Sequence, residues 1–309
     1  MSSVKIFSGS ATQQLADDIA HNYGNPLGKS ERQTFSDGEM GIYLTESVRG
    51  CDVFLIQSTF PPSDNILELL LMIDAAKRAS AKNVTVVVPY FGYARQDRKD
   101  KPRVSIAAKL MANLFTSAGA GRILTCDLHA QQIQGFFDIP VDHLDGSAIF
   151  VPYLKKLKLD NLIFASPDVG GTARARAYAK MFEVDMVVCD KHRKRANEIA
   201  SMQVIGDVKG KDVVLVDDMV DTAGTISKAS TIIKEKGANS VRAIATHGVL
   251  SGNAFKNIEE SALEELIITD TIPQKGGSDK IKVLTVSDLF AKAIRKIHDH
   301  ESISSLFIK

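Results

Sequence analysis

Short apolar runs alternate with amphipathic stretches through the first half of the chain. The apolar runs are rich in β-branched residues, which is typical of buried strands in a parallel sheet. The stretches between them have apolar residues at helical spacing, which predicts amphipathic helices. Ser63 or Asp64 is expected to cap the helix predicted at residues 63–80. Asp37–Gly38, between two extended runs, predicts a hairpin. The predicted strands cover residues 4–7, 52–58, 83–90 and 122–129, and the predicted helices cover residues 8–24, 63–80 and 104–119.

The same pattern restarts near residues 141–146. From it we predict two similar α/β domains, residues 1–145 and 146–309, each a doubly wound parallel sheet. The last helix, residues 288–300, is expected to pack back on the first domain. Ligands of such sheets bind beyond the carboxyl ends of the strands, so the loops there carry the candidate chemistry. The second domain has predicted helices at 147–158, 170–182, 226–237 and 254–261, and predicted strands at 161–168, 186–190, 213–216, 240–250, 263–270 and 280–286.

Composition limits the classes of function. Hydrophobic residues make up 44% of the 309 residues and charged residues 24%, as in ordinary globular proteins. Lys and Arg number 38 and Asp and Glu 37, so we expect no general attraction to nucleic acid or membrane. Three scattered cysteines have no metal-ligand spacing. Because the first residues do not resemble a signal peptide and no apolar run reaches membrane-helix length, we expect a cytoplasmic protein.

The stretch VVLVDDMVDTAGT, residues 213–225, joins a buried strand to a helix through two carboxylates and a small-residue loop. Backbone N–H groups at a helix start attract phosphate, and small residues allow close approach. Thr222 and Thr225 can donate to phosphate oxygens, and Asp217 and Asp218 can accept hydrogen bonds from ribose hydroxyls. One interpretation is therefore a sugar-phosphate site. The other is a buried strand followed by a capped helix.

A second strand end carries SPDVGGTARAR, residues 166–176. Asp168 is a hard oxygen ligand, and the backbone at Gly170 and Gly171 can present N–H groups to an anion. The arginines that follow add positive charge, so the combination suits a pyrophosphate bound with Mg²⁺. Taken alone, the stretch is explained better by a glycine turn with a pair of surface arginines than by a pyrophosphate site.

Four more loops carry candidate chemistry. His129 follows a strand; a lone His is more often structural, but a Mg²⁺ held with Asp168 is a hypothesis. The basic run KHRKR, residues 191–195, can place positive charge on a polyphosphate, with a solvated hairpin as the alternative. FSDGE (35–39) and YARQDRK (93–99) can stack on a base and read its edge, although a hairpin and a charged loop are the ordinary explanations.

These six stretches occur in the order and approximate spacing of ribose-phosphate diphosphokinases, also called phosphoribosyl pyrophosphate synthetases, of the phosphate-dependent class. The resemblance runs from Val4 to about Phe307. TCDLHAQQIQGFF and YARQDRK are signatures that simple phosphoribosyltransferases lack. The resemblance implies the type I phosphoribosyltransferase fold in both domains. It also implies transfer of a diphosphoryl group from ATP to ribose 5-phosphate with Mg²⁺.

The resemblance implies roles for individual residues. Lys191 and Arg193 would belong to a catalytic loop, and His129 and Asp168 to the Mg²⁺-ATP site. The implied ATP contacts are Phe35, Asp37 and Glu39 from a neighbouring subunit, and Arg95, Gln96, Asp97 and His129. The implied ribose 5-phosphate contacts are Asp217, Asp218, Asp221, Thr222, Ala223, Gly224 and Thr225, and the pyrophosphate loop contains Asp168, Gly170 and Gly171.

Regulation and assembly follow from the same resemblance. Inorganic phosphate would be an activator and ADP an inhibitor, at a regulatory site with Ser47, Arg49 and Arg103, and with Ser304 or Ser305. The segment KDKPRVSI and the tail ISSLFIK depart from the family forms, so allosteric control stays open. A shared ATP site implies at least a dimer, and family members form hexamers.

Two other functions stay open. A plain phosphoribosyltransferase would share the loop at 213–225, but it explains neither two α/β halves nor an ATP loop. A non-catalytic regulatory relative would carry altered catalytic loops, whereas KHRKR, DLH and SPDVGG are intact.

Overall fold

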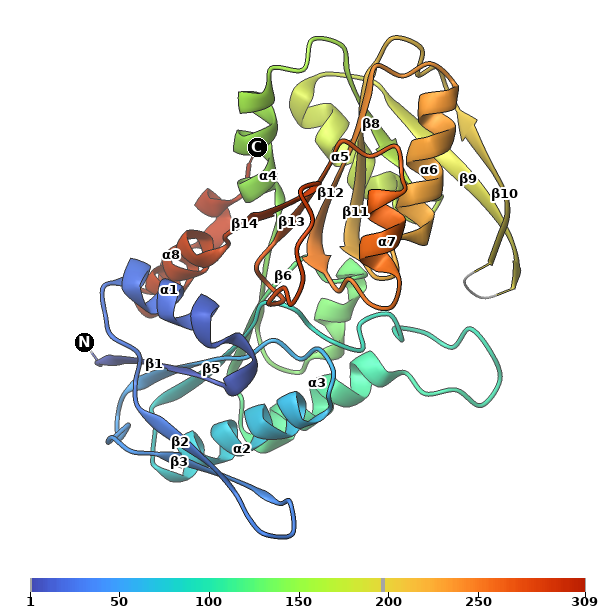
Figure 1. Cartoon of the computed structure of the whole chain (residues 1–309). Helices are drawn as coiled ribbons and strands as arrows, with labels where there is room; N and C mark the ends of the chain where they lie inside the picture. The colour runs from blue at the N-terminus through green and yellow to red at the C-terminus, as the bar shows by residue number, and fades with distance from the viewer. Residues whose placement is uncertain (1, 196–197, 309) are drawn as a thin grey trace. The chain divides into compact units, whose positions relative to one another are not determined.

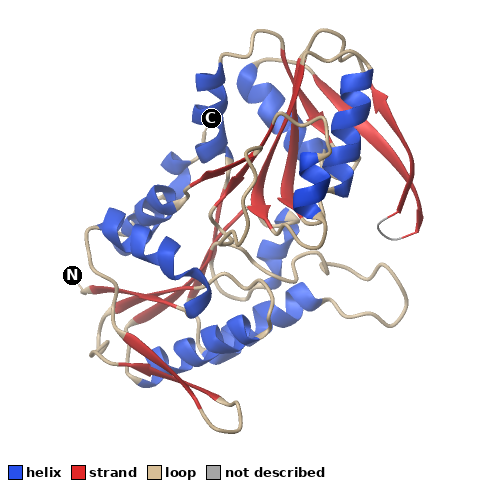
Figure 2. Cartoon of the chain, in the orientation of Figure 1, coloured by secondary structure: helices blue, strands red, loops and turns tan. Residues whose placement is uncertain are grey.

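The computed structural model describes residues 2–195 and 198–308, and the side chains of 191–201 lie outside the description. The chain divides into two compact units, each with strands flanked by helices, and each is described by itself (Figures 1 and 2). Unit 1 comprises the chain up to Asp145 with Thr271–Pro273 and Val286–Phe307. Unit 2 comprises Gly146–Asp270 with Gln274–Thr285 and Ile308. None of the helices described here has the length and apolar content needed to cross a bilayer.

Unit 1 is built on a five-stranded parallel sheet whose strands lie side by side in chain order. β4 is buried throughout, as its apolar run predicts. The last strand is not predicted by the sequence, because VDHL is apolar only at its two ends. The five strands are β1 (Val4–Ser8), β4 (Asp52–Ile56), β5 (Asn83–Val88), β6 (Arg122–Cys126) and β7 (Val141–Leu144).

Two helices cover one face of this sheet, α2 (Asp64–Arg78) and α3 (Ala107–Ala118). Their apolar stripes, with Leu69 and Phe115 fully buried, pack on alternate residues of the strands. Ser63 precedes α2 as expected, but its side chain makes no capping bond; its Oγ lies 3.3 Å from the hydroxyl of Tyr93. Unit 1 also contains the short 3₁₀ helices Ser10–Thr12, Gln131–Phe136 and Ile303–Leu306.

The C-terminal helix α8 (Ser287–His298) packs beside α1 (Gln13–Tyr23) within unit 1 (Figure 1). Asn22 donates to the hydroxyl of Ser287 at 2.9 Å. The guanidinium of Arg295 lies 4.6 Å from the ring centre of Tyr23, and His298 Nδ1 lies 2.9 Å from a carboxylate oxygen of Asp52. Side-chain contacts at both ends therefore hold α8 on unit 1.

Unit 2 is built on a seven-stranded sheet in the order β10-β9-β8-β11-β12-β13-β14. All neighbours are parallel except β10, which runs antiparallel to β9. From β8 the chain goes outward to β9 on one side, and it resumes at β11 on the other side. The strands are β8 (Leu162–Ser166), β9 (Met186–Arg195), β10 (Glu198–Ile205), β11 (Asp212–Val220), β12 (Ser240–Gly248), β13 (Glu265–Thr269) and β14 (Ile281–Leu284).

Helices cover both faces of the second sheet, as a doubly wound fold requires. Val214 and Val216 of β11 pack with α4 (Ser147–Leu157) and α5 (Thr172–Phe182). Val213 and Leu215, which point to the opposite face, pack with α6 (Gly224–Glu235) and α7 (Ala254–Glu259). The predicted α/β fold class with parallel sheets is confirmed.

Two boundaries differ from the sequence prediction. β11 continues to Val220, so Asp217 and Asp218 lie inside the strand instead of following it. Pairing with β12 carries the strand onward, since Asp217 is in register with Ala245 and Val220 with Gly248. The basic run expected as a loop after residue 190 continues the strand β9, which pairs with β10 as a long hairpin.

Candidate active site

The loops after β8 and β11 meet at the place where the order of unit 2 reverses. These strands are hydrogen-bonded neighbours, and both point their carboxyl ends to the same edge. Loops at such a reversal diverge to opposite faces and leave a crevice where α/β proteins bind ligands. The topology therefore brings the two glycine-containing stretches of unit 2 to a single ligand-binding edge.

The loop after β8 is folded around the carboxylate of Asp168. Its Oδ1 accepts a hydrogen bond from the N–H of Gly171 at 3.0 Å, and the hydroxyl of Ser166 donates to the Asp168 carbonyl at 2.5 Å. A Cβ on Gly171 would lie 2.9 Å from the hydroxyl oxygen of Ser166, so a larger residue there would displace the hydroxyl that donates to the Asp168 carbonyl. At Gly170 a Cβ would lie 3.2 Å from the Asp168 carboxylate. The loop thus places backbone without side chains directly beside the Asp168 carboxylate, where a ligand could approach both.

The acidic pair at the end of β11 concentrates negative charge. Asp218 is buried with only 6% of its surface exposed, and its N–H donates to Asp217 Oδ1 at 2.9 Å. Burial raises the pKa of Asp217 well above its usual range, and the carboxylates of Asp218 and Asp168 raise it further. The two strand ends therefore form one electrostatic site, which favours a cation or hydrogen-bond donors such as sugar hydroxyls.

The loop from Asp221 to Thr225 opens α6. Ala223 has left-handed backbone angles, φ 59° and ψ 1°, and has no side-chain atom that could cap the helix. The first turn is closed by the Ser227 N–H, which donates to the Ala223 carbonyl at 3.0 Å. The first N–H groups of a helix have no partner within it, so this loop offers them to an anion. Such a helix start suits a phosphate group.

Two residues that sequence reasoning missed brace this loop. The hydroxyl of Ser251 donates to the Asp221 carboxylate, and the Ser251 N–H donates to the Asp221 carbonyl at 3.0 Å. Asn257, on α7, donates its side-chain amide to the Thr222 carbonyl at 2.8 Å. The sequence signal for such residues was the polar stretch SGN, residues 251–253, which follows β12. Because β12 lies next to β11 in the sheet, the loops after these two strands end at the same edge.

The donor set of unit 2 fits Mg²⁺, which prefers oxygen ligands and is commonly held by one or two carboxylates together with substrate phosphates. The carboxylates of Asp218 and Asp168 both act on that of Asp217 there. A divalent cation would relieve their mutual repulsion. No group of three or more His, Cys, Asp or Glu side chains with metal-binding geometry occurs in the described part of the chain.

In unit 1, the predicted nucleotide contacts at residues 35–39 form the tip of a hairpin made by β2 (Ser30–Thr34) and β3 (Met40–Leu44). The N–H of Phe35 donates to the Glu39 carbonyl at 2.8 Å, and the N–H of Glu39 donates to Asp37 Oδ1 at 3.0 Å. The Phe35 side chain is 47% exposed, and its ring lies over Gly41. The tip is therefore an ordered turn with an exposed aromatic ring, which suits stacking on a base.

Two other predicted loops of unit 1 meet beyond the ends of β5 and β6. Gln132 donates to the Asp97 carboxylate at 3.2 Å, which joins residues 95–97 to the segment after the exposed His129. Gln96 accepts a hydrogen bond from Ser105 at 3.2 Å. These contacts bring Arg95, Gln96, Asp97 and His129 to the carboxyl edge of the first sheet.

The other predicted residues lie elsewhere. Lys191 and Arg193 fall in the stretch whose side chains lie outside the described residues. Arg49 is exposed and donates to the hydroxyl of Ser80 at 3.3 Å. Ser47, Arg103, Ser304 and Ser305 are also exposed.

Comparison with known proteins covers nearly the whole chain. A family model described as the N-terminal domain of ribose phosphate pyrophosphokinase matches residues 4–119. A second, the phosphoribosyl synthetase-associated domain, matches residues 186–308.

Individual relatives extend this match. A ribose-phosphate pyrophosphokinase of Porphyromonas gingivalis is 58% identical over 98% of this chain and 97% of its own length. One of Wolinella succinogenes is 55% identical over the full length of both chains. A crystal structure of phosphoribosylpyrophosphate synthetase from Mycobacterium smegmatis has a TM-score of 0.91 at 39% identity, covering 96% of this chain and 99% of that one.

Proposed function

The chain belongs to the ribose-phosphate pyrophosphokinase family, and from this premise we propose which of its residues carry the reaction. The protein transfers the β,γ-diphosphoryl group of ATP to the C1 hydroxyl of ribose 5-phosphate, giving phosphoribosyl pyrophosphate and AMP for nucleotide biosynthesis. The observation that carries our assignment is the pairing of β8 with β11, which brings Asp168, after one strand, and Asp217 and Asp218, near the end of the other, to the edge where the helix start at Ala223 lies.

Unit 2 is proposed to hold the acceptor. The N–H groups from Ala223 to Thr225 and the hydroxyls of Thr222 and Thr225 bind the 5-phosphate. Asp217 and Asp218 accept hydrogen bonds from the ribose hydroxyls and orient the sugar. The loop at Asp168, Gly170 and Gly171 lies at the next strand end and receives the diphosphate.

Unit 1 is proposed to hold the nucleotide. Phe35 stacks on the adenine, and Asp37 and Glu39 offer carboxylate acceptors beside it. Arg95, Gln96 and Asp97, with His129, contact the nucleotide from the loops that Gln132 joins. The hairpin tip serves the nucleotide of a neighbouring subunit, so the active enzyme is at least a dimer, with a hexamer as its full assembly.

The transfer is an in-line displacement at the β-phosphorus of ATP by the C1 hydroxyl, with AMP as the leaving group. No covalent enzyme intermediate is needed, so the protein contributes positioning and charge. Lys191 and Arg193 stabilise the negative charge that builds on the transferred group. The chemistry that Mg²⁺ supplies is neutralisation of diphosphate oxygens, with His129 and Asp168 as its proposed protein ligands.

Regulation and location complete the proposal. Exposed Ser47, Arg49 and Arg103, with Ser304 or Ser305, offer hydroxyl and guanidinium donors that suit inorganic phosphate as an activator. We propose that the enzyme acts in the cytoplasm.

A coupled assay of AMP release tests this proposal. The purified chain is incubated with ATP and Mg²⁺, with and without ribose 5-phosphate. Both reactions are then repeated with added inorganic phosphate and with added ADP. We expect AMP only when ribose 5-phosphate is present, activation by phosphate and inhibition by ADP. A plain phosphoribosyltransferase would form no AMP from these substrates, and a non-catalytic relative would be inactive in every arm.

A further inference from the structure

The hairpin of β2 and β3, whose tip we propose to contact ATP, is attached to the rest of unit 1 without joining its five-stranded sheet. We call it the nucleotide hairpin. β2 and β3 form a separate two-stranded sheet in the described part of the chain, and β2 is exposed along its whole length. An isolated two-stranded hairpin is marginally stable in water. On one side, Ile42 and Leu44 of β3 pack on the apolar core of unit 1. On the other side, β2 pairs with β3 along its length and adds one polar side-chain contact to the rest of unit 1.

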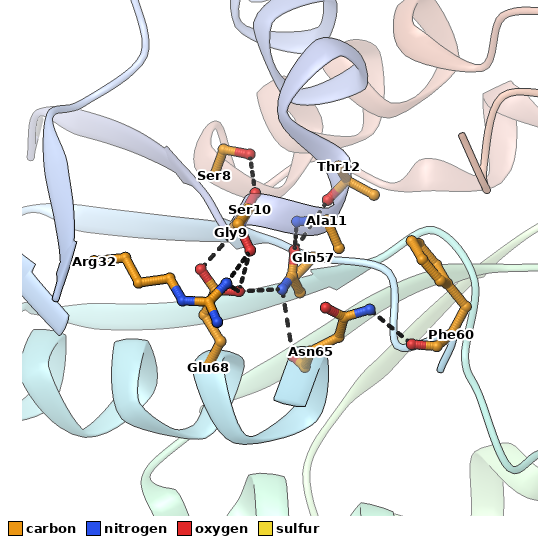
Figure 3. Close-up of polar contacts among 10 residues, drawn as sticks. All are labelled: Ser8, Gly9, Ser10, Ala11, Thr12, Arg32, Gln57, Phe60, Asn65 and Glu68. Carbon is orange, nitrogen blue, oxygen red and sulfur yellow. Dashed lines mark hydrogen bonds and ion pairs between the residues drawn. The ribbon is translucent and has the colours of Figure 1, made fainter. Parts of the chain in front are cut away.

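That contact is made to a buried carboxylate, Glu68 of α2, which is 3% exposed (Figure 3). Glu68 Oε1 accepts a hydrogen bond from the N–H of Ser10 at 3.0 Å. Its Oε2 accepts from the Ser10 hydroxyl at 2.6 Å and from the Gln57 amide at 3.0 Å. A buried carboxylate with this many donors is held in one geometry, because losing any donor leaves charge without compensation.

Arg32 of β2 reaches this group from the hairpin. Its Nη1 donates to the Ser10 hydroxyl at 2.9 Å and lies 3.8 Å from Glu68 Oε2 (Figure 3). Ser10 thus accepts from Arg32 and donates to Glu68, so the three side chains form a chain of polarised hydrogen bonds. We call Arg32, Ser10, Glu68 and Gln57 the hairpin anchor.

The anchor has little freedom to shift. Ala11 N–H donates to Gln57 Oε1 at 3.1 Å, and a Cβ on Gly9 would lie 2.4 Å from Gln57 Cδ. The segment after β1 is therefore pressed against the Gln57 side chain. Arg32 attaches the hairpin to a rigid base only three positions before Phe35.

We propose that Arg32 is a positioning residue for the nucleotide: by holding β2 on Ser10 and Glu68, it fixes the orientation in which the hairpin tip meets a purine nucleotide. This inference rests on the proposed function, in which Phe35, Asp37 and Glu39 contact ATP. Arg32 itself contacts no substrate in this account. Its contribution is to keep the tip ordered before ATP arrives, which lowers the cost of binding.

Steady-state kinetics of Arg32→Met provide the first test, because methionine keeps much of the length and loses both donors and charge. We expect the KM for ATP to rise about 5- to 10-fold, as for one lost charge-assisted hydrogen bond. The KM for ribose 5-phosphate should change by less than about twofold. Arg32→Lys keeps one donor and should recover part of the ATP affinity. Glu31→Gln, one position earlier on exposed β2, is the matched control and should leave both constants unchanged.

A spectroscopic arm separates this inference from the proposed function. The chain has no tryptophan, so Phe35→Trp places a single indole at the hairpin tip. In that background, Arg32→Met should increase the amplitude of fast anisotropy decay without nucleotide, whereas Glu31→Gln should not. If Arg32→Met leaves the anisotropy decay unchanged, the positioning role is overturned. The same conclusion follows if Arg32→Met raises the KM values for ATP and ribose 5-phosphate equally and lowers the melting temperature.

Phe35→Ala in the original background tests the premise. If it raises the KM for ATP and Arg32→Met does not, the positioning role fails while the nucleotide assignment stands. If Phe35→Ala leaves the KM for ATP unchanged, the nucleotide assignment of the hairpin fails and the inference falls with it.

Discussion

Asn257 Nδ2 lies 2.8 Å from the carbonyl oxygen of Thr222, a hydrogen bond that ties α7 to the loop opening α6. The donor and acceptor are 35 positions apart in the chain. Fixing the Thr222 carbonyl also fixes the peptide plane that carries the next N–H group, which we propose to bind phosphate. A residue that contacts no substrate in our account thus orients the acceptor site.

Replacing Asn257 with leucine should weaken ribose 5-phosphate binding. The side chain keeps a similar volume, but the donor to Thr222 is lost, at a cost of about 1 kcal/mol. We expect the KM for ribose 5-phosphate to rise about fivefold, with the KM for ATP unchanged. Lys256→Met, one position earlier on the exposed side of α7, is the control in steady-state assays. Equal effects of the two substitutions on ribose 5-phosphate would refute the bracing role.

Asp217→Asn should stabilise the protein at neutral pH while it impairs ribose binding. The pKa of Asp217 is raised by burial and by Asp218 and Asp168, so its ionised form costs folding free energy. We expect a melting temperature about 2–4 °C higher at pH 7.5, the shift that about 1 kcal/mol produces in a domain of this size.

The pH dependence fixes the cause of that gain. The unfolded chain loses the Asp217 proton at about pH 4, whereas the folded protein keeps it to a higher pH. The penalty therefore grows as pH rises from the unfolded pKa to the folded pKa and is constant above it. The gain should therefore shrink as the melting measurements move from pH 7.5 toward pH 5. Asp279→Asn, at an exposed position of unit 2, is the control. A gain that does not vary with pH would show that repulsion among the carboxylates is not its origin.

The backbone conformation at Ala223 disfavours a β-branched side chain at this position. Left-handed angles are accessible to glycine and costly for β-branched residues. Ala223→Gly should keep kcat/KM for ribose 5-phosphate within about threefold, whereas Ala223→Val should lower it by more than about tenfold because the loop must rearrange. Kinetics of both variants, with circular dichroism to verify folding, check this. Full activity of the valine variant would contradict the loop geometry.

Lys191→Ala should lower kcat by more than about 100-fold, equivalent to about 2.7 kcal/mol of transition-state stabilisation. The expectation comes from the residue's place in KHRKR and from the charge that diphosphoryl transfer requires. Lys209→Ala, at an exposed position of unit 2, is the control. A change in kcat of less than threefold would remove Lys191 from catalysis.

The sequence predicts the presence and order of most strands well, because runs such as 53–56 and 86–88 are apolar and the segments after them are polar or glycine-rich. It predicts the end of β11 too early, since Asp218 looks like a loop residue and yet lies buried inside the strand, which pairs with β12 as far as Val220. β7 is missed because its sequence lacks an apolar core.

The supporting contacts are beyond sequence reasoning for a different reason. Ser10 meets Glu68 across 58 positions, and Arg32 reaches Ser10 across 22. None of these residues belongs to a recognisable motif, and only the folded arrangement of β1, β2 and α2 brings them together. The motifs therefore supplied the residues that we propose to meet the substrates, while the structure was needed to find those that hold the motifs in place.

The most direct test follows the fate of the phosphorus atoms of ATP. ATP labelled with ³²P at the β position is incubated with the purified chain, Mg²⁺ and ribose 5-phosphate, and the products are separated by ion-exchange chromatography. Diphosphoryl transfer predicts that the label moves into phosphoribosyl pyrophosphate and that the AMP carries none. Label recovered in ADP, or in inorganic phosphate or pyrophosphate without a ribosyl product, would contradict the account.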